Sequence, residues 1–351
     1  MKKRHVNIPI FIPNIGCRHQ CVFCDQKTIS GEKSFDPGRV KMQIEEALTT
    51  LDPERDEIEI AFFGGSFTGL DRETMDFLLR TAAFYLETGK VSSLRLSTRP
   101  DMIDEEILAT LKKYHVSDIE LGIQSTDDKV LCLCRRGHTA KATETASELI
   151  KAHGFTLVGQ MMTSLPGSSP ESERKTAEDM VKFGVDAVRI YPLVVFENTP
   201  LAEMMRNGFY HPSCREDTIS RAASLLAFFA EKNIPVLRIG LQASEALADP
   251  TQAIGGWYSP SLGEEVRSAV YLMKILSEIG NRDPKNQSLT VFCPPGAVSQ
   301  VIGKKKCNLF ELQKRFQPAS IAVRESDAIS PFSPRIEIGE EKNLSEKEVT
   351  R

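Results

Sequence analysis

Three cysteines, Cys17, Cys21 and Cys24, lie within eight residues in a C-x3-C-x2-C pattern. Thiolates are soft ligands that select iron–sulfur clusters or zinc. Three of them on one loop can ligate three irons of a [4Fe–4S] cube and leave the fourth iron open, which suits a reactive cluster. The alternative is a structural zinc held by three thiolates and His19, although the loop lacks the paired C-x2-C knuckles of such sites.

The composition is that of an ordinary globular protein. The chain has 351 residues, of which 41% are hydrophobic and 26% charged, with a formal net charge of −4. It is long enough for one large domain and a smaller one. Because the chain is weakly acidic, any RNA site must be a local basic patch. No apolar run is long enough to span a membrane, and sparse cysteines without a secretion signal predict a cytoplasmic protein.

Short apolar strands alternate with amphipathic helices over the first 190 residues. This alternation predicts an α/β fold with a parallel sheet and functional loops at the carboxyl ends of the strands. We expect strands at residues 7–12, 58–63, 93–97, 118–122, 156–161 and 187–191. We expect the intervening helices at residues 37–50, 71–88, 104–114, 140–153 and 169–183.

The cysteine loop, with Phe23 before the third cysteine, resembles the signature of the radical S-adenosylmethionine (SAM) superfamily. The resemblance implies that Cys17, Cys21 and Cys24 hold a [4Fe–4S] cluster whose open iron binds SAM. It also implies reductive cleavage of SAM to a 5'-deoxyadenosyl radical, with Phe23 beside the adenine. The fold implied is a (βα)6 partial TIM barrel, and the partner implied is a low-potential electron donor such as flavodoxin or ferredoxin.

Gly64, Gly65 and Ser66 directly follow the second expected strand. Two glycines at a strand end let the backbone approach a ligand closely, although they could equally form a simple tight turn. The segment resembles the glycine-rich stretch that holds the methionine amino group of SAM in the same family. That family often has an acidic residue at the position of Ser66.

Further SAM contacts are expected after the third and fourth strands. Arg99 precedes Pro100, which favours an extended backbone and a side chain that projects into a pocket; the alternative is a surface salt bridge to Asp101 or Asp104. Gln124 and Arg136 stand in G-x-Q-S and R-x-G-H segments similar to those of oxygen-independent coproporphyrinogen III oxidases. That resemblance implies that both residues contact SAM.

The residues at the end of the fifth expected strand help to distinguish between possible substrates. Porphyrinogen oxidases carry an acidic residue where this chain has Gln160, which we include among the SAM-contacting residues. The Met-Met-x-x-Leu-Pro pattern that follows resembles the catalytic subunit of Elongator, which acts on wobble uridine in tRNA. We therefore expect RNA, and specifically tRNA, as substrate, with a small molecule such as a porphyrinogen as the alternative. Elongator's acetyltransferase domain has no counterpart in the sequence.

The sequence patterns in the last third of the chain predict a small α+β extension. Gly303 is followed by Lys304, Lys305 and Lys306 at a helix start, in a turn that resembles the G-x-x-G loop with which KH domains clamp nucleic acid. The second glycine is replaced by Lys306, and a solvated lysine turn is the alternative. A non-enzymatic RNA-binding protein with a structural metal is the third hypothesis for the whole chain.

Four segments are expected from these patterns. They are a radical SAM partial-barrel domain at residues 1–242, a helical connector at 243–285, a small α+β unit at 286–335 and a charged tail at 336–351.

Overall fold

The computed structural model describes residues 3–31 and 34–339. The chain divides into two compact units, each treated separately below. The barrel unit comprises the chain up to Thr218 together with Lys232–Pro260. The C-terminal unit comprises Ile219–Glu231 and the chain from Ser261 onward. The barrel unit therefore ends at Pro260, whereas the sequence patterns placed the end of the barrel domain at residue 242.

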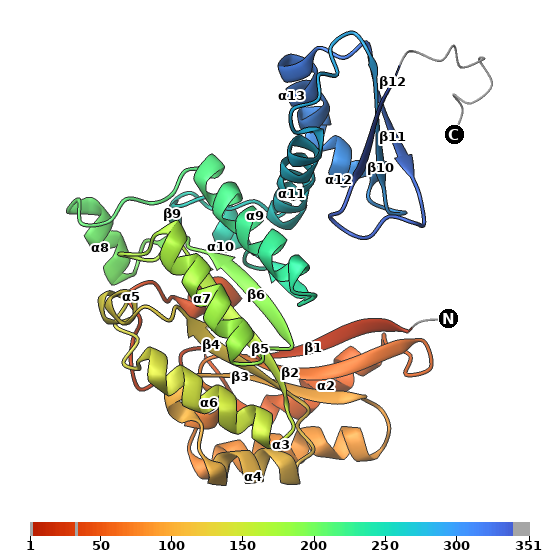
Figure 1. Cartoon of the computed structure of the whole chain (residues 1–351). Helices are drawn as coiled ribbons and strands as arrows, with labels where there is room; N and C mark the ends of the chain where they lie inside the picture. Colours follow the sequence, from red (N-terminus) through yellow and green to blue (C-terminus); the bar gives the residue numbers. More distant parts are fainter. Residues whose placement is uncertain (1–2, 32–33, 340–351) are drawn as a thin grey trace. The chain divides into compact units, whose positions relative to one another are not determined.

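Seven parallel strands form the sheet of the barrel unit, in the order β1-β2-β3-β4-β5-β6-β8. Figure 1 shows the sheet curled into a partial barrel, so the predicted fold class is confirmed. The strands are β1 (Arg4–Ile12), β2 (Asp56–Gly64), β3 (Ser93–Thr98), β4 (Asp118–Gln124), β5 (Thr156–Thr163), β6 (Ala187–Pro192) and β8 (Val236–Ile239).

Helices pack on the outer face of this sheet, where α3, α4, α6 and α7 are seen in Figure 1. Ile58, Ile60 and Phe62 of β2 are buried with them, while the alternate residue Glu59 faces the interior of the barrel. The predicted helices correspond to α2 (Val40–Leu48), α3 (Arg72–Glu87), α4 (Glu105–Lys113), α6 (Ala140–Ala152) and α7 (Pro170–Lys182). Short elements that the patterns did not predict are α1 (Gln26–Ser30), α5 (Asp128–Leu133), β7 (Val195–Phe196), α10 (Glu245–Ala248) and β9 (Ala253–Gly255).

Local sequence sets the ends of the helices. Asp71 caps α3 by accepting a hydrogen bond from the backbone N–H of Thr74, and Asp104 caps α4 in the same way. Gly154 and Gly184 follow α6 and α7 with positive φ angles, as expected of residues after a helix end. Two more helices, α8 (Pro200–Arg206) and α9 (Arg215–Glu231), follow β7.

A three-stranded sheet with the order β11-β10-β12 forms the core of the C-terminal unit. Its elements are α11 (Leu262–Ile279), β10 (Ser288–Cys293), α12 (Val298–Ile302), α13 (Cys307–Phe316), β11 (Ser320–Glu325) and β12 (Arg335–Gly339). Strand β12 corrects the prediction that a charged tail begins at residue 336. Its alternation of Ile336 and Ile338 with polar residues is a strand pattern, and it pairs antiparallel with β10. The rest of the predicted tail lies outside the described residues.

The segment predicted as a helical connector is more varied than expected. Residues 243–285 contain α10 and α11 but also β9, which pairs with β7 of the barrel unit. In the part of the chain that the structure describes, no helix has the length and apolar character needed to cross a bilayer.

Candidate active site

A cavity lies at the carboxyl ends of the barrel strands, and most of the predicted site residues line it. The parallel topology brings these strand ends together, although the residues are up to 143 positions apart in sequence. The predicted residues that line the cavity are Cys17, Cys21, Phe23, Cys24, Gly64, Gly65, Arg99, Gln124, Arg136 and Gln160. Met162 also lines it, whereas Met161 is fully buried in the core.

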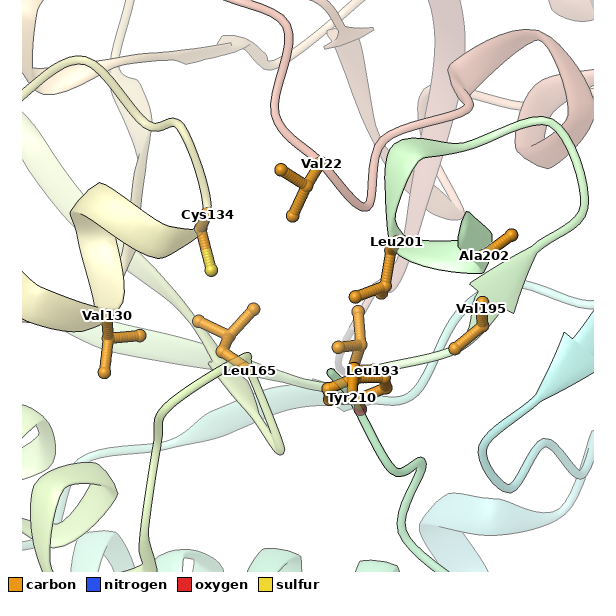
Figure 2. Packing of buried hydrophobic residues seen from close by; sticks show 9 residues of the cluster. All are labelled: Val22, Val130, Cys134, Leu165, Leu193, Val195, Leu201, Ala202 and Tyr210. Atoms are coloured by element: carbon orange, nitrogen blue, oxygen red, sulfur yellow. The ribbon is translucent and has the colours of Figure 1, made fainter. Parts of the chain in front are cut away.

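The cysteine loop is anchored by Val22, whose side chain packs into a buried apolar cluster (Figure 2). That cluster contains Val130, Cys134, Leu165, Leu193, Val195, Leu201, Ala202 and Tyr210. The backbone N–H of Val22 donates to the carbonyl of Cys134 at 3.1 Å, and the Val22 carbonyl accepts from Leu201 at 2.9 Å. Because Val22 stands between Cys21 and Phe23, its burial fixes the segment from which the ligand side chains project.

The two glycines after β2 allow the segment before the cysteine loop to pack against the strand end. The N–H of Gly65 donates to the carbonyl of Ile12 at 2.7 Å. A Cβ atom on Gly65 would lie 2.1 Å from the carbonyl oxygen of Ile15, and one on Gly64 would lie 2.9 Å from that of Ile12. Gln26 bridges the same elements through the N–H of Asn14 and the carbonyl of Gly64. No sequence signal had indicated Gln26.

Burial and mutual repulsion oppose ionisation of the thiols. Burial raises the pKa of Cys17, and burial together with the neighbouring Cys21 and Cys17 raises the pKa of Cys24 to about 12. Thiols in such a site release their protons when a metal centre binds, because the metal supplies positive charge that stabilises the thiolates. Arg136 partly supplies it already, since its Nη1 lies 3.2 Å from the sulfur of Cys21.

The three cysteine side chains line one cavity, and thiols are the donors that hold a [4Fe–4S] cluster. Within residues 3–31 and 34–339, no three His, Cys, Asp or Glu side chains converge closely enough to hold one ion. A zinc site requires such convergence, with each sulfur about 2.3 Å from the same metal. Thiolates of a [4Fe–4S] cube bind different irons and stand further apart. The donor set therefore fits the cluster predicted from the sequence.

Arg99 and Arg136 form the polar wall beside Cys21. Arg99 is buried, and its Nε donates to Asp101 at 2.9 Å. It also donates to the carbonyl of Arg136, and its Nη1 lies 3.9 Å from the Cys21 sulfur. Arg99 thus lines the cavity and also pairs with Asp101, which does not line it. Arg136 donates to the carbonyl of Gly122 at 2.5 Å, whereas the adjacent Arg135 is exposed.

His138 helps to orient the guanidinium of Arg136 by accepting a hydrogen bond from it. The Nε of Arg136 donates to Nε2 of His138 at 3.3 Å, and Nδ1 of the ring lies 3.3 Å from the carbonyl of Thr139. Burial and the guanidinium of Arg136 lower the pKa of His138 to about 4. The ring is therefore neutral near pH 7, with its proton on Nδ1.

Gln124 holds an unused acceptor inside the cavity. Its backbone lies in the left-handed region, with φ of 65°, at an irregularity in the pairing of β4 with β5. Among the described residues, the buried Oε1 of Gln124 and the buried Oγ of Ser97 have no hydrogen-bond partner. A buried acceptor without a donor costs about 1–3 kcal/mol, so a bound ligand that donates hydroxyls would relieve it. The ribose of SAM offers two such hydroxyls.

Ser66 is placed differently from the other predicted contacts. Its side chain is fully buried, bonds the hydroxyl of Thr98 at 2.9 Å and does not line the cavity. Its backbone N–H instead donates to Cys17. Ser66 therefore reaches the cysteine site through its main chain.

A network of buried charges lies beneath the cavity, inside the barrel. Arg95 donates to Glu59 at 2.7 Å and to Glu120 at 3.2 Å, and Glu120 also pairs with Arg189 at 2.7 Å. Gln160 joins the network by donating to Glu120 at 2.7 Å. The amide of Gln160 is thus oriented by Glu120, within a network of charges on four other strands, β2, β3, β4 and β6. Sequence patterns did not predict this network.

The three lysines of the C-terminal unit are not equivalent. Lys304 donates to the hydroxyl of Ser261 at 2.9 Å and pairs with Glu265 at 3.5 Å. Lys305 and Lys306 are exposed and have no ion-pair partner in the described part of the chain. Both have left-handed backbones, with φ of 54° and 63°. The turn lies between α12 and α13, as the patterns indicated.

Comparison with known proteins matches two family models to this chain. A model described as the radical SAM superfamily matches residues 11–180, and one described as the Radical_SAM C-terminal domain matches residues 185–271. The tRNA uridine(34) acetyltransferase of Methanocaldococcus jannaschii is 30% identical over 53% of this chain and 38% of its own length. Human Elongator complex protein 3 is 28% identical over 55% of this chain and 39% of its own length.

Two further relatives extend the match. An uncharacterised protein of Methanocaldococcus jannaschii is 28% identical over 73% of this chain and 81% of its own length. Among solved structures, the archaeal Methanocaldococcus infernus Elp3 lacking residues 1–46 superposes with a TM-score of 0.61 and 24% identity, over 80% of this chain and 65% of that one. The chain thus spans about two fifths of the length of the acetyltransferase and Elongator relatives.

Proposed function

Because this chain belongs to the radical SAM superfamily, we propose that it is an enzyme that cleaves SAM reductively and acts on RNA, with tRNA as the substrate class. Enzymes of this superfamily use a [4Fe–4S] cluster and SAM. When bound, the cluster supplies the electron that converts SAM to a 5'-deoxyadenosyl radical. The observation that carries the proposal is the convergence of three cysteine thiols, two guanidinium groups and an unpaired amide oxygen in one cavity.

Each residue of the cavity has a role in this proposal. Cys17, Cys21 and Cys24 hold the cluster, and Phe23 borders the adenine. Gln124 accepts from the ribose hydroxyls. Arg136 holds the SAM carboxylate with a fork that already points toward Cys21. Gly64 and Gly65 present backbone groups to the methionine amino end.

A direct test is anaerobic reconstitution. The purified protein should hold roughly four irons per chain and release 5'-deoxyadenosine from SAM under dithionite. Cys24→Ala should lose both properties. Cys132→Ala is the matched control, because Cys132 is exposed and does not line the cavity, and it should keep both. Iron binding without any SAM cleavage in the wild-type protein would contradict the proposal.

The RNA substrate is supported by the relatives that modify tRNA and by Lys305 and Lys306. Both side chains are exposed and unpaired in the described structure, so they are available to phosphates. Lys304 is held by Glu265 and contributes less. Each lysine–phosphate contact adds about one unit to the salt dependence of binding.

Filter binding of bulk tRNA between 50 and 200 mM salt tests this part. Lys305→Glu with Lys306→Glu should weaken binding and lower the slope of log K against log salt by about two. Lys314→Glu with Arg315→Glu, at the other end of α13, is the matched control. An unchanged slope would remove the lysine turn from the RNA site. No affinity for RNA at low salt would favour a small-molecule substrate, and nucleoside analysis after turnover decides between them.

A further inference from the structure

We propose that Tyr191 and Gln160 bind the edge of a substrate base on which a carbonyl group stands next to an N–H, as in uracil. Uracil and guanine carry this edge, whereas cytosine and adenine do not. The inference rests on the proposed function, because it places an RNA base in the active-site cavity. It adds the two residues that recognise the base and the bases that they reject.

The wall of the active-site cavity has two parts. The SAM contacts proposed above lie on the first part, which ends in the sequence at Arg136. From residue 160 onward, and among the described residues, only Gln160 and Tyr191 bring polar side chains to the wall. An apolar wall suits the faces of a planar ring, and two polar groups suit its edge. The apolar members of this second part are Met162, Pro192, Leu193, Val194, Phe196 and Leu241.

Tyr191 offers the cavity a hydrogen-bond donor. The guanidinium of Arg189 is hydrogen-bonded to the Tyr191 hydroxyl. Arginine has no acceptor, so the Tyr191 oxygen accepts in this contact and its proton remains to be donated. No acceptor takes that proton among residues 3–31 and 34–339. Burial raises the pKa of Tyr191, so the hydroxyl keeps its proton at neutral pH.

Arg189 holds this hydroxyl in place because it is itself fixed from two other sides. Its guanidinium pairs with Glu120 at 2.7 Å, and its central carbon lies 5.5 Å from the centre of the Phe63 ring. Both partners belong to other strands of the barrel. The direction of the Tyr191 donor is therefore set before a ligand enters.

Gln160 offers an acceptor on the same wall. Its Nε2 donates to Glu120 at 2.7 Å. Because Glu120 pairs with two arginines, it is a carboxylate that can only accept, and this fixes which end of the Gln160 amide faces it. The Oε1 of Gln160 has no donor in the described part of the chain and is left for a ligand N–H.

The register of β5 and β6 brings the donor and the acceptor together. Gln160 pairs with Arg189, and Met162 pairs with Tyr191. Side chains two positions apart on a strand share a face, so Gln160 and Tyr191 are diagonal neighbours on adjacent strands. Gln160, which the sequence patterns predicted as a SAM contact, is thereby assigned to the substrate.

This pair of groups complements one kind of base edge and opposes the other. With uracil, the carbonyl accepts from the Tyr191 hydroxyl and the adjacent N–H donates to Gln160 Oε1. With cytosine, an amino group faces the hydroxyl donor and an unprotonated ring nitrogen faces the amide oxygen. Both contacts are then unfavourable, and discrimination by such a pair is about tenfold or more.

The test compares RNAs that differ only in the base. Hexauridylate and hexacytidylate with a 5' fluorescent label are titrated with the reconstituted enzyme, oxidised and saturated with SAM, and anisotropy is measured. Hexauridylate should bind about tenfold more tightly or better. Tyr191→Phe should reduce this ratio about fivefold or more by weakening hexauridylate alone. The matched control Tyr114→Phe should keep the ratio, because the Tyr114 hydroxyl donates to Asp76 and does not line the cavity.

Methylation of the base at N3 supplies the second readout. A hexamer of 3-methyluridine lacks the N–H and should bind the wild type about tenfold more weakly than hexauridylate, whereas Gln160→Leu should bind the two alike. Equal affinity of the wild type for hexauridylate and hexacytidylate would overturn the inference and leave SAM cleavage under dithionite untouched. An equal loss of both RNAs in Tyr191→Phe would show a merely structural role and would overturn it too. Absence of any affinity for these hexamers and for tRNA at low salt would instead overturn the RNA substrate of the proposed function.

Discussion

We expect the stability of this protein to depend on pH through His138. We expect the substitution His138→Gln to remove that dependence. The ring is buried beside the guanidinium of Arg136, and its pKa is lowered to about 4 in the folded state. An unfolded chain has an ordinary histidine pKa of about 6.5. Between these values the unfolded state binds one proton more than the folded state, so stability falls as pH falls. Above pH 6.5 both states are neutral at this ring, and the contribution is constant.

The magnitude follows from the difference of about 2.5 pKa units. At about 1.4 kcal/mol per unit, the folded state loses about 3 kcal/mol by pH 4, of which about 2 kcal/mol is lost between pH 6.5 and 5. His138→Gln should remove this loss, because an amide oxygen can still accept from Arg136 but cannot titrate. The variant should therefore lie closer to the wild type at pH 5 than at pH 7.

The assay is urea unfolding of the anaerobically reconstituted full-length protein at pH values from 5 to 7.5. Other titrating groups, including the thiols, contribute equally to both proteins and cancel in the difference. His115→Asn, an exposed histidine whose left-handed backbone suits Asn, is the control and should follow the wild type. If the difference between wild type and His138→Gln stays constant from pH 7.5 to 5, His138 is not held neutral and the reasoning fails.

Three other substitutions follow from the geometry of the site. Gly65→Ala places a methyl group against the Ile15 carbonyl, so it should lower the free energy of unfolding by about 1–3 kcal/mol and lower the iron content. Gly339→Ala is the control and should do neither, because the space at its Cβ is open. Glu120→Gln removes a charge shared by two buried guanidinium groups, so it should lower the free energy of unfolding in urea by about 3–5 kcal/mol. The control Glu105→Gln, at an exposed residue, should lower it by less than about 0.5 kcal/mol. Arg136→Lys should weaken SAM binding about tenfold or more, measured by equilibrium dialysis, because a lysine cannot reproduce the fork; unchanged affinity would contradict the assigned role.

Local patterns predicted the elements and the cavity because both depend on short-range signals. The β–α alternation fixes a parallel sheet, and a parallel sheet gathers the strand ends on which the cysteine, glycine and arginine motifs lie. Resemblance to the R-x-G-H segment identified Arg136 rather than Arg135, and the structure places Arg136, but not Arg135, on the cavity wall.

Features that depend on register between strands were not predictable in this way. Glu59, Arg95 and Glu120 look like ordinary charged residues in three separate apolar segments. Only the observed pairing places them on the same interior face, where each neutralises another. Ser66 was misplaced for a related reason, since a glycine-rich turn does not reveal which of its side chains faces the ligand. Strand β12 was missed because its partner β10 lies more than 40 residues earlier.

The arrangement of the cysteine loop explains why two consecutive arginines occur after α5. A loop that holds a reactive cluster must face the substrate on one side and an electron source on the other. Val22 fixes the loop between these sides, and the backbone turn at Arg135 sends neighbouring side chains in opposite directions. Arg136 lines the cavity beside the sulfur of Cys21, while Arg135 is exposed and does not line it. A guanidinium at position 135 would lack the Gly122 carbonyl and His138 as partners, so we expect substitution of Arg136 to impair the cavity and substitution of Arg135 to leave it unchanged.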